Sequence, residues 1–187
     1  MLASEVFEVV LEGARRGDRD DLATLWRYYN PAMVRYLSIF VGSDCDDVAS
    51  EAWISIARAL KTFEGDEEAF RRFVIVIAKR KAVDFERGAI VRERRKDRFS
   101  IAYSRDLEIG ERSDVVDDSA DLLVLLKTYL PSEVAEIIFL RYILDFNVGE
   151  VAQIVNRSQE AVRTASHRGL LRLRERLLGK DLADIGL

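Results

Sequence analysis

The fold is decided by residues 148–167, which read VGEVAQIVNRSQEAVRTASH and fit the twenty-residue template of a helix-turn-helix unit. Ala152 is a small residue where two packed helices must cross, and Val162 points back into the core six residues after the turn. Asn156 falls at the turn itself, where the backbone needs a residue that tolerates positive φ. Ser158 can then cap the second helix. Such a unit usually places its second helix in the DNA major groove.

Charge is unevenly distributed along the chain, whose formal net charge is −4. Residues 71–98 carry 11 basic and 4 acidic side chains, and residues 157–176 carry 6 basic and 2 acidic ones. The rest of the chain is acidic. Either basic block alone is typical of a solvated helix face. One of them coincides with the helix-turn-helix, however, so the pattern favours a nucleic-acid partner.

Composition limits the class of protein. Two prolines and ten glycines in 187 residues suit a helical chain. The single cysteine, Cys45, excludes an intramolecular disulfide and a cysteine metal cluster, which fits a cytoplasmic protein. The N-terminus lacks the pattern of a signal peptide, and no apolar run is long enough to span a membrane, so we expect no membrane insertion.

Apolar residues at helical spacing predict helices through most of residues 1–98. Asn30-Pro31 predicts a helix start, Gly42 a helix end and Gly65 a break. After Phe99 the periodicity fades, and the segment from Asp106 to Asp121 holds seven acidic residues, so no packed element is expected there. We therefore predict an all-α fold of two small helical domains joined by a flexible acidic linker. The predicted parts are an N-terminal domain (1–98), the linker (99–120), a C-terminal helix-turn-helix domain (121–178) and a short tail (179–187).

Further motifs carry a family resemblance. FEGDEEAFRRF at residues 63–73 is followed by IAKRKAVD at 77–84, and Asp46-Asp47-Val48 stands before Glu51 and Trp53 on one predicted helix. Leu130-Pro131 precedes the helix-turn-helix. In this order the motifs resemble an extracytoplasmic-function (ECF) sigma factor of the sigma-70 family, the compact two-domain class of bacterial transcription initiation factor. The resemblance covers about residues 18–98 and 124–177.

The resemblance implies a sigma factor that binds core RNA polymerase and promoter DNA, reads the −35 element, and melts and reads the −10 element. It implies core-polymerase contacts from Asp46, Asp47, Glu51 and Trp53. It implies −10 contacts from Phe63, Arg71, Arg72, Phe73, Lys79, Arg80, Lys81 and Arg87. It implies −35 contacts from Gln159, Glu160, Arg163, Thr164, His167, Arg168 and Arg172. The family often has an anti-sigma factor as a further partner.

The residue types of the implied −10 site suit a melted strand, because single-stranded DNA is held by cations along its backbone and by aromatic rings against its bases. Phe70 and Ile77 are expected in the core, whereas Phe73 fits the core and the base-binding site equally well. Three adjacent cations, Lys79, Arg80 and Lys81, cannot all face one way on a helix.

Within the recognition helix, Arg163 is the expected base reader, because a guanidinium can pair bidentately with guanine. Arg168 and Arg172 are expected at phosphates. Core positions are predicted for Val162, Leu170, Leu173 and Leu177.

Four positions depart from the family pattern. Ser50 stands where Gln is common in the polymerase-binding helix, and Phe73 replaces the usual Trp, which removes the indole donor. Arg80 stands where Asn is frequent, and Ala165 where Arg or another polar residue is common. We expect these changes to affect promoter specificity.

Two other classes of function are compatible with parts of the sequence. A helix-turn-helix regulator that is not a polymerase subunit would explain residues 146–177 but leaves residues 44–98 without a purpose. An enzyme is disfavoured, because the sequence has no glycine-rich phosphate loop and no Ser-His-Asp arrangement. His167 is the only histidine, and Asp44, Asp46 and Asp47 fit the start of a helix better than a metal site. We expect no catalytic residue, no metal and no cofactor.

Overall fold

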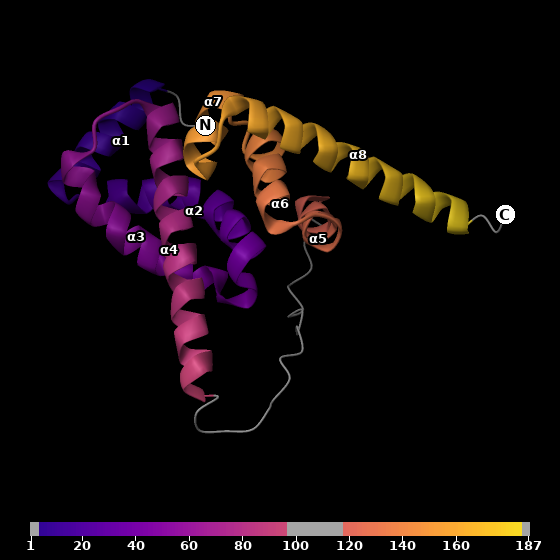
Figure 1. Ribbon diagram of the computed structural model, residues 1–187. Helices are drawn as coiled ribbons and strands as arrows, with labels where there is room; N and C mark the ends of the chain where they lie inside the picture. The colour runs from indigo at the N-terminus through magenta and orange to yellow at the C-terminus, as the bar shows by residue number, and fades with distance from the viewer. Residues whose placement is uncertain (1–3, 97–117, 185–187) are drawn as a thin grey trace. The chain divides into compact units, whose positions relative to one another are not determined.

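The computed structural model describes residues 4–96 and 118–184, and every regular element in these ranges is helical (Figure 1). Contacts divide the chain into an N-terminal unit, Met1–Ser113, and a C-terminal unit, Asp114–Leu187. The division falls inside the predicted linker, most of which lies outside the described residues. An all-α fold in two helical parts is therefore confirmed for the part of the chain that the structure describes.

The N-terminal unit is built around α2 (Arg19–Val41), which packs against α1 (Ser4–Arg16), α3 (Cys45–Ala59) and α4 (Glu67–Lys96). Two short 3-10 turns, Gly42–Asp44 and Leu60–Thr62, lie before and after α3. Apolar side chains from all four helices are fully buried between them, among them Phe7, Leu25, Met33, Ile56 and Phe70. An apolar stripe along α3 and into the turn that follows it is buried, namely Val48, Ala52, Ile56 and Leu60.

The predicted helix start at Asn30-Pro31 is wrong, because α2 runs through both residues. Pro31 removes one backbone hydrogen bond within the helix. The apolar face nevertheless continues from Leu25 to Met33 and beyond, and its burial offsets that cost. Asn30 is not a cap; its Oδ1 accepts a hydrogen bond from Nε1 of Trp53 at 3.0 Å.

The C-terminal unit contains α5 (Asp118–Tyr129), α6 (Ser132–Ile138), a π-helical turn (Phe139–Ile143), α7 (Val148–Val155) and α8 (Gln159–Asp184). α5, α6 and α7 all pack against α8. α5 begins within the last residues of the predicted linker, and α8 runs six residues past the predicted end of the domain at residue 178. The predicted tail is thus helical as far as Asp184.

The core of the C-terminal unit includes Leu126, Phe139, Val151 and Val162. Val162 and Leu173 are buried as predicted, but Leu170 and Leu177 are 40% and 43% exposed, so their predicted core positions are wrong. Figure 1 shows the reason for Leu177: the far half of α8 extends beyond α5, α6 and α7.

Candidate nucleic-acid interface

The helix-turn-helix has the local geometry that its residues predict. α7 ends at Asn156, which adopts the left-handed conformation with φ 54° and ψ 51°. The backbone N–H of Ala161 donates to Oγ of Ser158 at 3.1 Å, so Ser158 caps α8. Ala152 and Val162 are buried at the crossing of the two helices. The predicted turn, cap and crossing are therefore confirmed.

A second cap, which was not predicted, lies at the start of α7. Oδ1 of Asn147 accepts from the backbone N–H of Glu150 at 3.0 Å, and the Glu150 carboxylate accepts from the backbone N–H of Asn147 at 2.9 Å. This reciprocal pair is a capping box. The spacing of Asn147 and Glu150 in the sequence was the signal that could have revealed it.

Gly169 fixes which face of α8 points outward. A Cβ atom at this position would lie 2.5 Å from Cδ1 of Ile138 and 2.7 Å from Cγ1 of Val134, so only glycine lets α8 approach α6 this closely. Val162, Ser166 and Leu173 share the buried face with Gly169. The opposite face of α8 is therefore free for a ligand.

All seven residues predicted at the −35 element are exposed on α8, namely Gln159, Glu160, Arg163, Thr164, His167, Arg168 and Arg172. The structure divides them between two flanks of the helix. Arg163 and Arg172 are nine residues apart, which is about two and a half turns, so they point to opposite sides of α8. Nη2 of Arg163 lies 3.4 Å from Oε1 of Gln159, which orients the guanidinium along the first turns.

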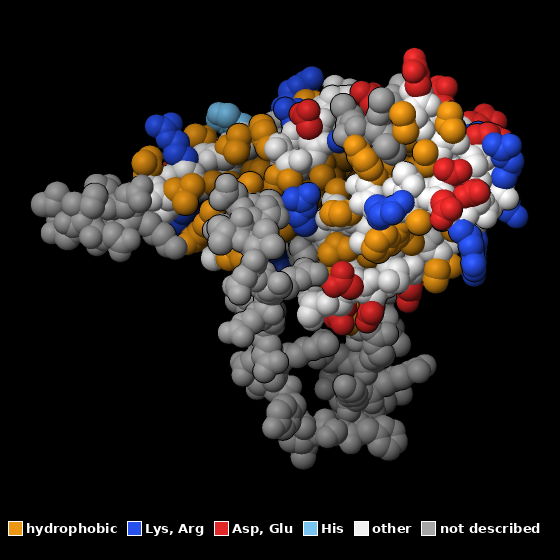
Figure 2. Space-filling model, turned by 180° about the vertical axis from the view of Figure 1, so that it is seen from behind, with side chains coloured by type: hydrophobic (Ala, Val, Ile, Leu, Met, Phe, Trp, Pro, Cys, Tyr) orange, Lys and Arg blue, Asp and Glu red, His pale blue; other side chains and the backbone are white. Residues whose placement is uncertain are grey.

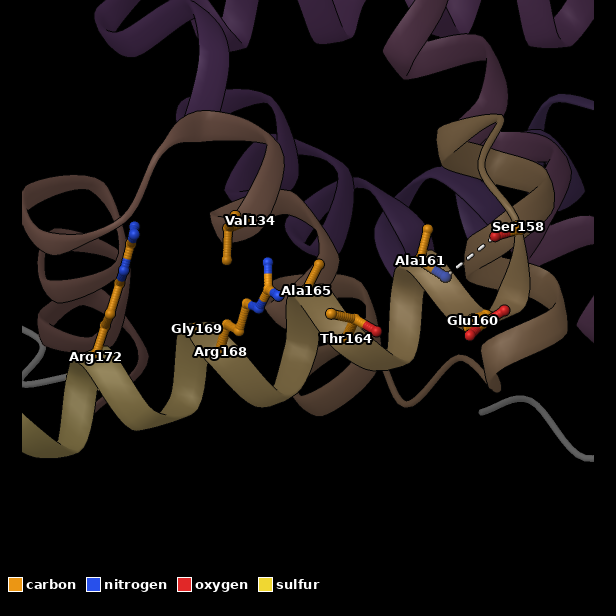
Figure 3. A pocket seen from close by; sticks show the side chains of 9 residues that line it. All are labelled: Val134, Ser158, Glu160, Ala161, Thr164, Ala165, Arg168, Gly169 and Arg172. Atoms are coloured by element: carbon orange, nitrogen blue, oxygen red, sulfur yellow. Dashed lines mark hydrogen bonds between the residues drawn. The ribbon is translucent and has the colours of Figure 1, made fainter.

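One flank of α8 forms a groove of about 580 Å³ against α6 (Figure 3). Its lining includes Glu160, Thr164, Arg168 and Arg172 of the predicted set, together with Ser158, Ala161, Ala165, Gly169 and Val134. Ala165, one of the departures from the family pattern, therefore leaves space beside Arg168 rather than presenting a polar group. In Figure 2, α8 carries the pale-blue histidine and shows basic side chains among exposed hydrophobic ones.

A further cation, Arg157, lies in the turn before α8 and was not predicted as a site residue. Its Nη2 is 2.9 Å from a carboxylate oxygen of Glu133 at the start of α6. Both side chains are exposed, so this ion pair contributes little to stability. It places a positive charge at the N-terminal end of the recognition helix.

In the N-terminal unit, the exposed face of α3 presents Asp46, Asp47 and Glu51. Ile54 lies on the same face and is 54% exposed, so an apolar side chain stands beside three carboxylates. The Ser50 hydroxyl donates to the backbone carbonyl of Asp46 at 2.9 Å. The face thus offers negative charge and an apolar contact to a partner.

Trp53 does not belong to this exposed face. Only 7% of the residue is exposed, and its indole N–H is used by Asn30 of α2. This burial argues against the predicted contact between Trp53 and polymerase. The side chain instead fixes α3 against α2.

The aromatic residues near the start of α4 form one cluster. The ring of Phe70 is fully buried, as predicted, and its centroid lies 5.4 Å from that of Phe63 and 6.0 Å from that of Phe73. The Phe63 and Phe73 centroids are 4.9 Å apart, and both residues are half-buried. Each of these two residues therefore packs in the cluster and keeps some exposed surface. Ile77, predicted to be in the core, is half-buried as well.

The structure separates the cations predicted at the −10 element. Arg80 and Arg87 are exposed, whereas Arg71, Arg72 and Lys79 are half-buried. Nζ of Lys81 lies 3.7 Å from a carboxylate oxygen of Glu51, so Lys81 turns toward α3. This ion pair joins a residue predicted to bind DNA with one predicted to bind polymerase, and the Glu51 side chain remains 69% exposed.

Comparison with known proteins matches each unit to a part of one family. Residues 25–99 match the family described as Sigma-70 region 2, and residues 129–175 match Sigma-70, region 4. The chain is 29% identical over 184 residues to the ECF RNA polymerase sigma factor SigD of Mycobacterium tuberculosis, covering 95% of this chain and 86% of the relative. It is 28% identical over 185 residues to the ECF RNA polymerase sigma factor ShbA of Streptomyces griseus, covering 90% of this chain and 94% of the relative.

Two solved structures have a similar fold. CnrH, solved in complex with the cytosolic domain of CnrY, superposes with a TM-score of 0.61 at 20% identity, covering 91% of this chain and 96% of that chain. The sigma factor RpoE of Bartonella quintana, solved with the anti-sigma factor NepR, superposes with a TM-score of 0.65 at 17% identity. The match covers 84% of this chain and 96% of that chain. The two region matches, in order along one chain, agree with the relatives and with the helical units. The chain therefore belongs to the ECF group of the sigma-70 family of RNA polymerase sigma factors.

Proposed function

We propose that the chain binds core RNA polymerase and directs promoter-specific transcription initiation. The observation that carries this proposal is the pairing of a region 2 match and a region 4 match on two separate helical units. A helix-turn-helix regulator that is not a polymerase subunit would need only the second unit, so it leaves α3 and α4 without a role. The proposal assigns the chain no catalytic activity of its own and no cofactor.

The C-terminal unit is the proposed reader of the −35 element. The exposed face of α8 enters the major groove, with Thr164 and His167 opposite the buried Val162 and Ser166. Arg163 on one flank reads a base edge, and Arg172 on the other neutralises phosphate. The two flanks of the helix thereby face the two walls of the groove.

The N-terminal unit is the proposed site for the −10 element and for polymerase. The exposed parts of Phe63 and Phe73 stack on unpaired bases, while Arg80 and Arg87 follow the strand backbone. On α3, the strip Asp46, Asp47, Glu51 and Ile54 contacts core polymerase. Trp53 holds α3 in place from the buried side.

The remaining parts of the proposal concern partners and location. Both solved structures described above are complexes with a protein partner, and in one of them the partner is named as an anti-sigma factor. We propose an anti-sigma partner for this chain as well. Across the described residues, no helix combines the length and the apolar character that membrane spanning requires. The proposed place of action is the cytoplasm, where RNA polymerase works.

Binding to core polymerase separates the proposal from the regulator alternative. Asp47→Asn and Ile54→Ser both alter the exposed strip of α3 without touching the core. Each should weaken binding of the full chain to purified core polymerase by about tenfold, because interface truncations of this kind cost on the order of 1 kcal/mol or more. Fluorescence titration of labelled chain with core polymerase measures the affinity.

Glu8→Gln on α1 is the matched control, since Glu8 is also an exposed acid of the N-terminal unit. Its affinity for core polymerase should equal that of the unaltered chain. If the unaltered chain shows no affinity for core polymerase, the regulator alternative replaces the proposal. If the unaltered chain binds core polymerase and the two α3 variants bind it with the same affinity, the assigned surface is wrong.

A further inference from the structure

The loop of residues 63–66 joins the 3-10 turn after α3 to α4 and carries Phe63 beside the aromatic cluster. Its shape depends on Gly65, which has φ 147° and whose Cβ position would lie 2.7 Å from Cβ of Ala69. Asp66 closes the loop, because its Oδ1 accepts from the backbone N–H of Ala69 at 2.9 Å. The loop therefore enters α4 with a defined backbone path.

The end of the loop at α4 is fastened to α2. The hydroxyl of Tyr29 donates to the carboxylate of Glu67, the first residue of α4, at 3.0 Å. Both residues are buried, and the Tyr29 ring packs edge-on against Phe70 with 5.1 Å between centroids. This contact fixes where α4 begins.

The opposite end of the loop is fastened to α1. Nη2 of Arg15 donates to the backbone carbonyl of Phe63, while Nη1 lies 3.5 Å from the Glu12 carboxylate. The Arg15 side chain is 29% exposed, so its bond to the carbonyl is partly shielded from water. A guanidinium can hold two partners at once in a fixed plane, which an ammonium group cannot do.

Phe63 is thereby held in three ways. Its N–H donates to the carbonyl of Leu60 at 3.2 Å, its carbonyl accepts from Arg15, and its ring contacts Phe70 and Phe73. The residue is only half-buried, so it keeps some exposed surface. A ring fixed in one position before binding loses less conformational entropy when a base stacks on it.

We propose that Arg15 is a positioning residue for capture of the melted −10 strand. It acts through the Phe63 carbonyl and makes no contact with DNA itself. The proposal rests on the proposed function, since it takes the exposed part of Phe63 as a base-stacking surface. The residue belongs to α1, which precedes the Sigma-70 region 2 match at 25–99 and so adds a contact from outside that region.

Arg16 provides a matched control on the same helix. Its Nε lies 3.8 Å from the Glu12 carboxylate and 3.3 Å from the Glu12 carbonyl, and its side chain is 72% exposed. Both of these contacts go to Glu12, within α1 itself. Arg15→Met and Arg16→Met therefore remove the same charge from the same turn, and only the first releases Phe63.

The test uses holoenzyme assembled from core polymerase and the full chain. A randomised pool of single-stranded DNA is first selected on the unaltered holoenzyme, and the selected strand is then titrated against each variant. Arg15→Met should bind this strand about tenfold more weakly than Arg16→Met, since a hydrogen bond from a charged group is lost. Affinity for core polymerase should be the same for both. Arg15→Lys should recover part of the loss.

Equal strand affinity for Arg15→Met and Arg16→Met would overturn the positioning role. If Arg15→Met does not fold, Arg15→Lys is compared with Arg16→Lys: weaker strand binding supports the role, and equal binding overturns it. If the unaltered holoenzyme selects no strand, the proposed −10 function fails and the positioning role fails with it. If the unaltered holoenzyme selects a strand and the two variants bind it with equal affinity, the positioning role is contradicted and the proposed −10 function is not.

Discussion

Tyr29 and Glu67 form a buried hydrogen bond that joins α2 to the first residue of α4. Tyr29→Phe keeps the ring and removes the donor, which leaves a buried carboxylate with one fewer partner. We expect the variant to lose about 1–3 kcal/mol of unfolding free energy near neutral pH. Urea unfolding followed by tryptophan fluorescence reports on this unit, because Trp26 and Trp53 both belong to it.

The same pair predicts a dependence on alkaline pH. Burial, followed by the nearby Glu67 carboxylate, raises the pKa of Tyr29 above its ordinary value near 10. A raised pKa means that the folded state keeps a proton that the unfolded state releases. Stability from this group is therefore fully present below pH 10 and falls above it, by at most about 1.4 kcal/mol per pH unit.

The difference in stability between Tyr29→Phe and the unaltered chain should shrink from pH 9 to pH 11. A constant difference across this range would show that Tyr29 does not keep its proton in the folded state.

Single residues could be predicted where the backbone conformation alone decides which residue types fit. Asn156 and Ser158 follow from the conformation of a tight turn and from the unpaired N–H groups of a helix start. The exposure of Leu170 and the burial of Trp53 were not predicted, because exposure depends on which neighbouring helix lies opposite. A side chain's type does not specify that neighbour.

At the scale of elements, the close contact between α6 and α8 determines how the recognition helix is presented. Gly169→Leu should force the two helices apart and destabilise the C-terminal unit by about 1–3 kcal/mol, because Val134 and Ile138 leave no room for a side chain. Hydrogen-exchange mass spectrometry of the full chain measures this as faster exchange in α6 and α8. Glu175→Leu, an exposed position on the same helix, should leave exchange unchanged, and equal exchange in both variants would refute the packing argument.

Arg163 and Arg172 should have different effects on DNA binding, because they lie on opposite flanks of α8. Arg163→Ala should relax sequence preference at one position of the −35 element and cost about 1–3 kcal/mol there. Arg172→Ala should weaken binding almost equally for all sequences. It should also reduce the slope of log K against log[salt] by about one, the contribution of one phosphate contact. Binding selections on randomised −35 DNA measure both effects. The opposite result, with base preference changed only by Arg172→Ala, would require a different docking of the helix.

Helices were predictable from apolar spacing, but their ends and contacts were only partly so. The start of α3 was placed well from its acidic first turn, Asp46 and Asp47, and the start of α8 from its capping residue Ser158. α2 was divided at Pro31, because the burial that carries it through the proline comes from three other helices. The need for glycine at position 169 was not predicted, because it comes from the side chains of α6, which lie far from Gly169 in the sequence.

At the scale of the whole molecule, two helical units divide the proposed binding tasks. The sequence indicated this division through its alternating acidic and basic blocks and through the resemblance at both ends. It did not indicate that Lys81 pairs with Glu51, or that Arg15 reaches the loop before α4, because both contacts join separate helices. The site residues within each unit were therefore predicted as a set, and the structure distinguishes exposed members from paired or buried ones.

Run-off transcription with purified core polymerase on genomic fragments tests the central claim most directly. The account predicts discrete transcripts that require both the chain and core polymerase, and that decrease with Asp47→Asn but not with Glu8→Gln. Start sites should share a −35 and a −10 element. The account would be contradicted if the chain bound fragments by itself and core polymerase gave the same transcripts with and without it.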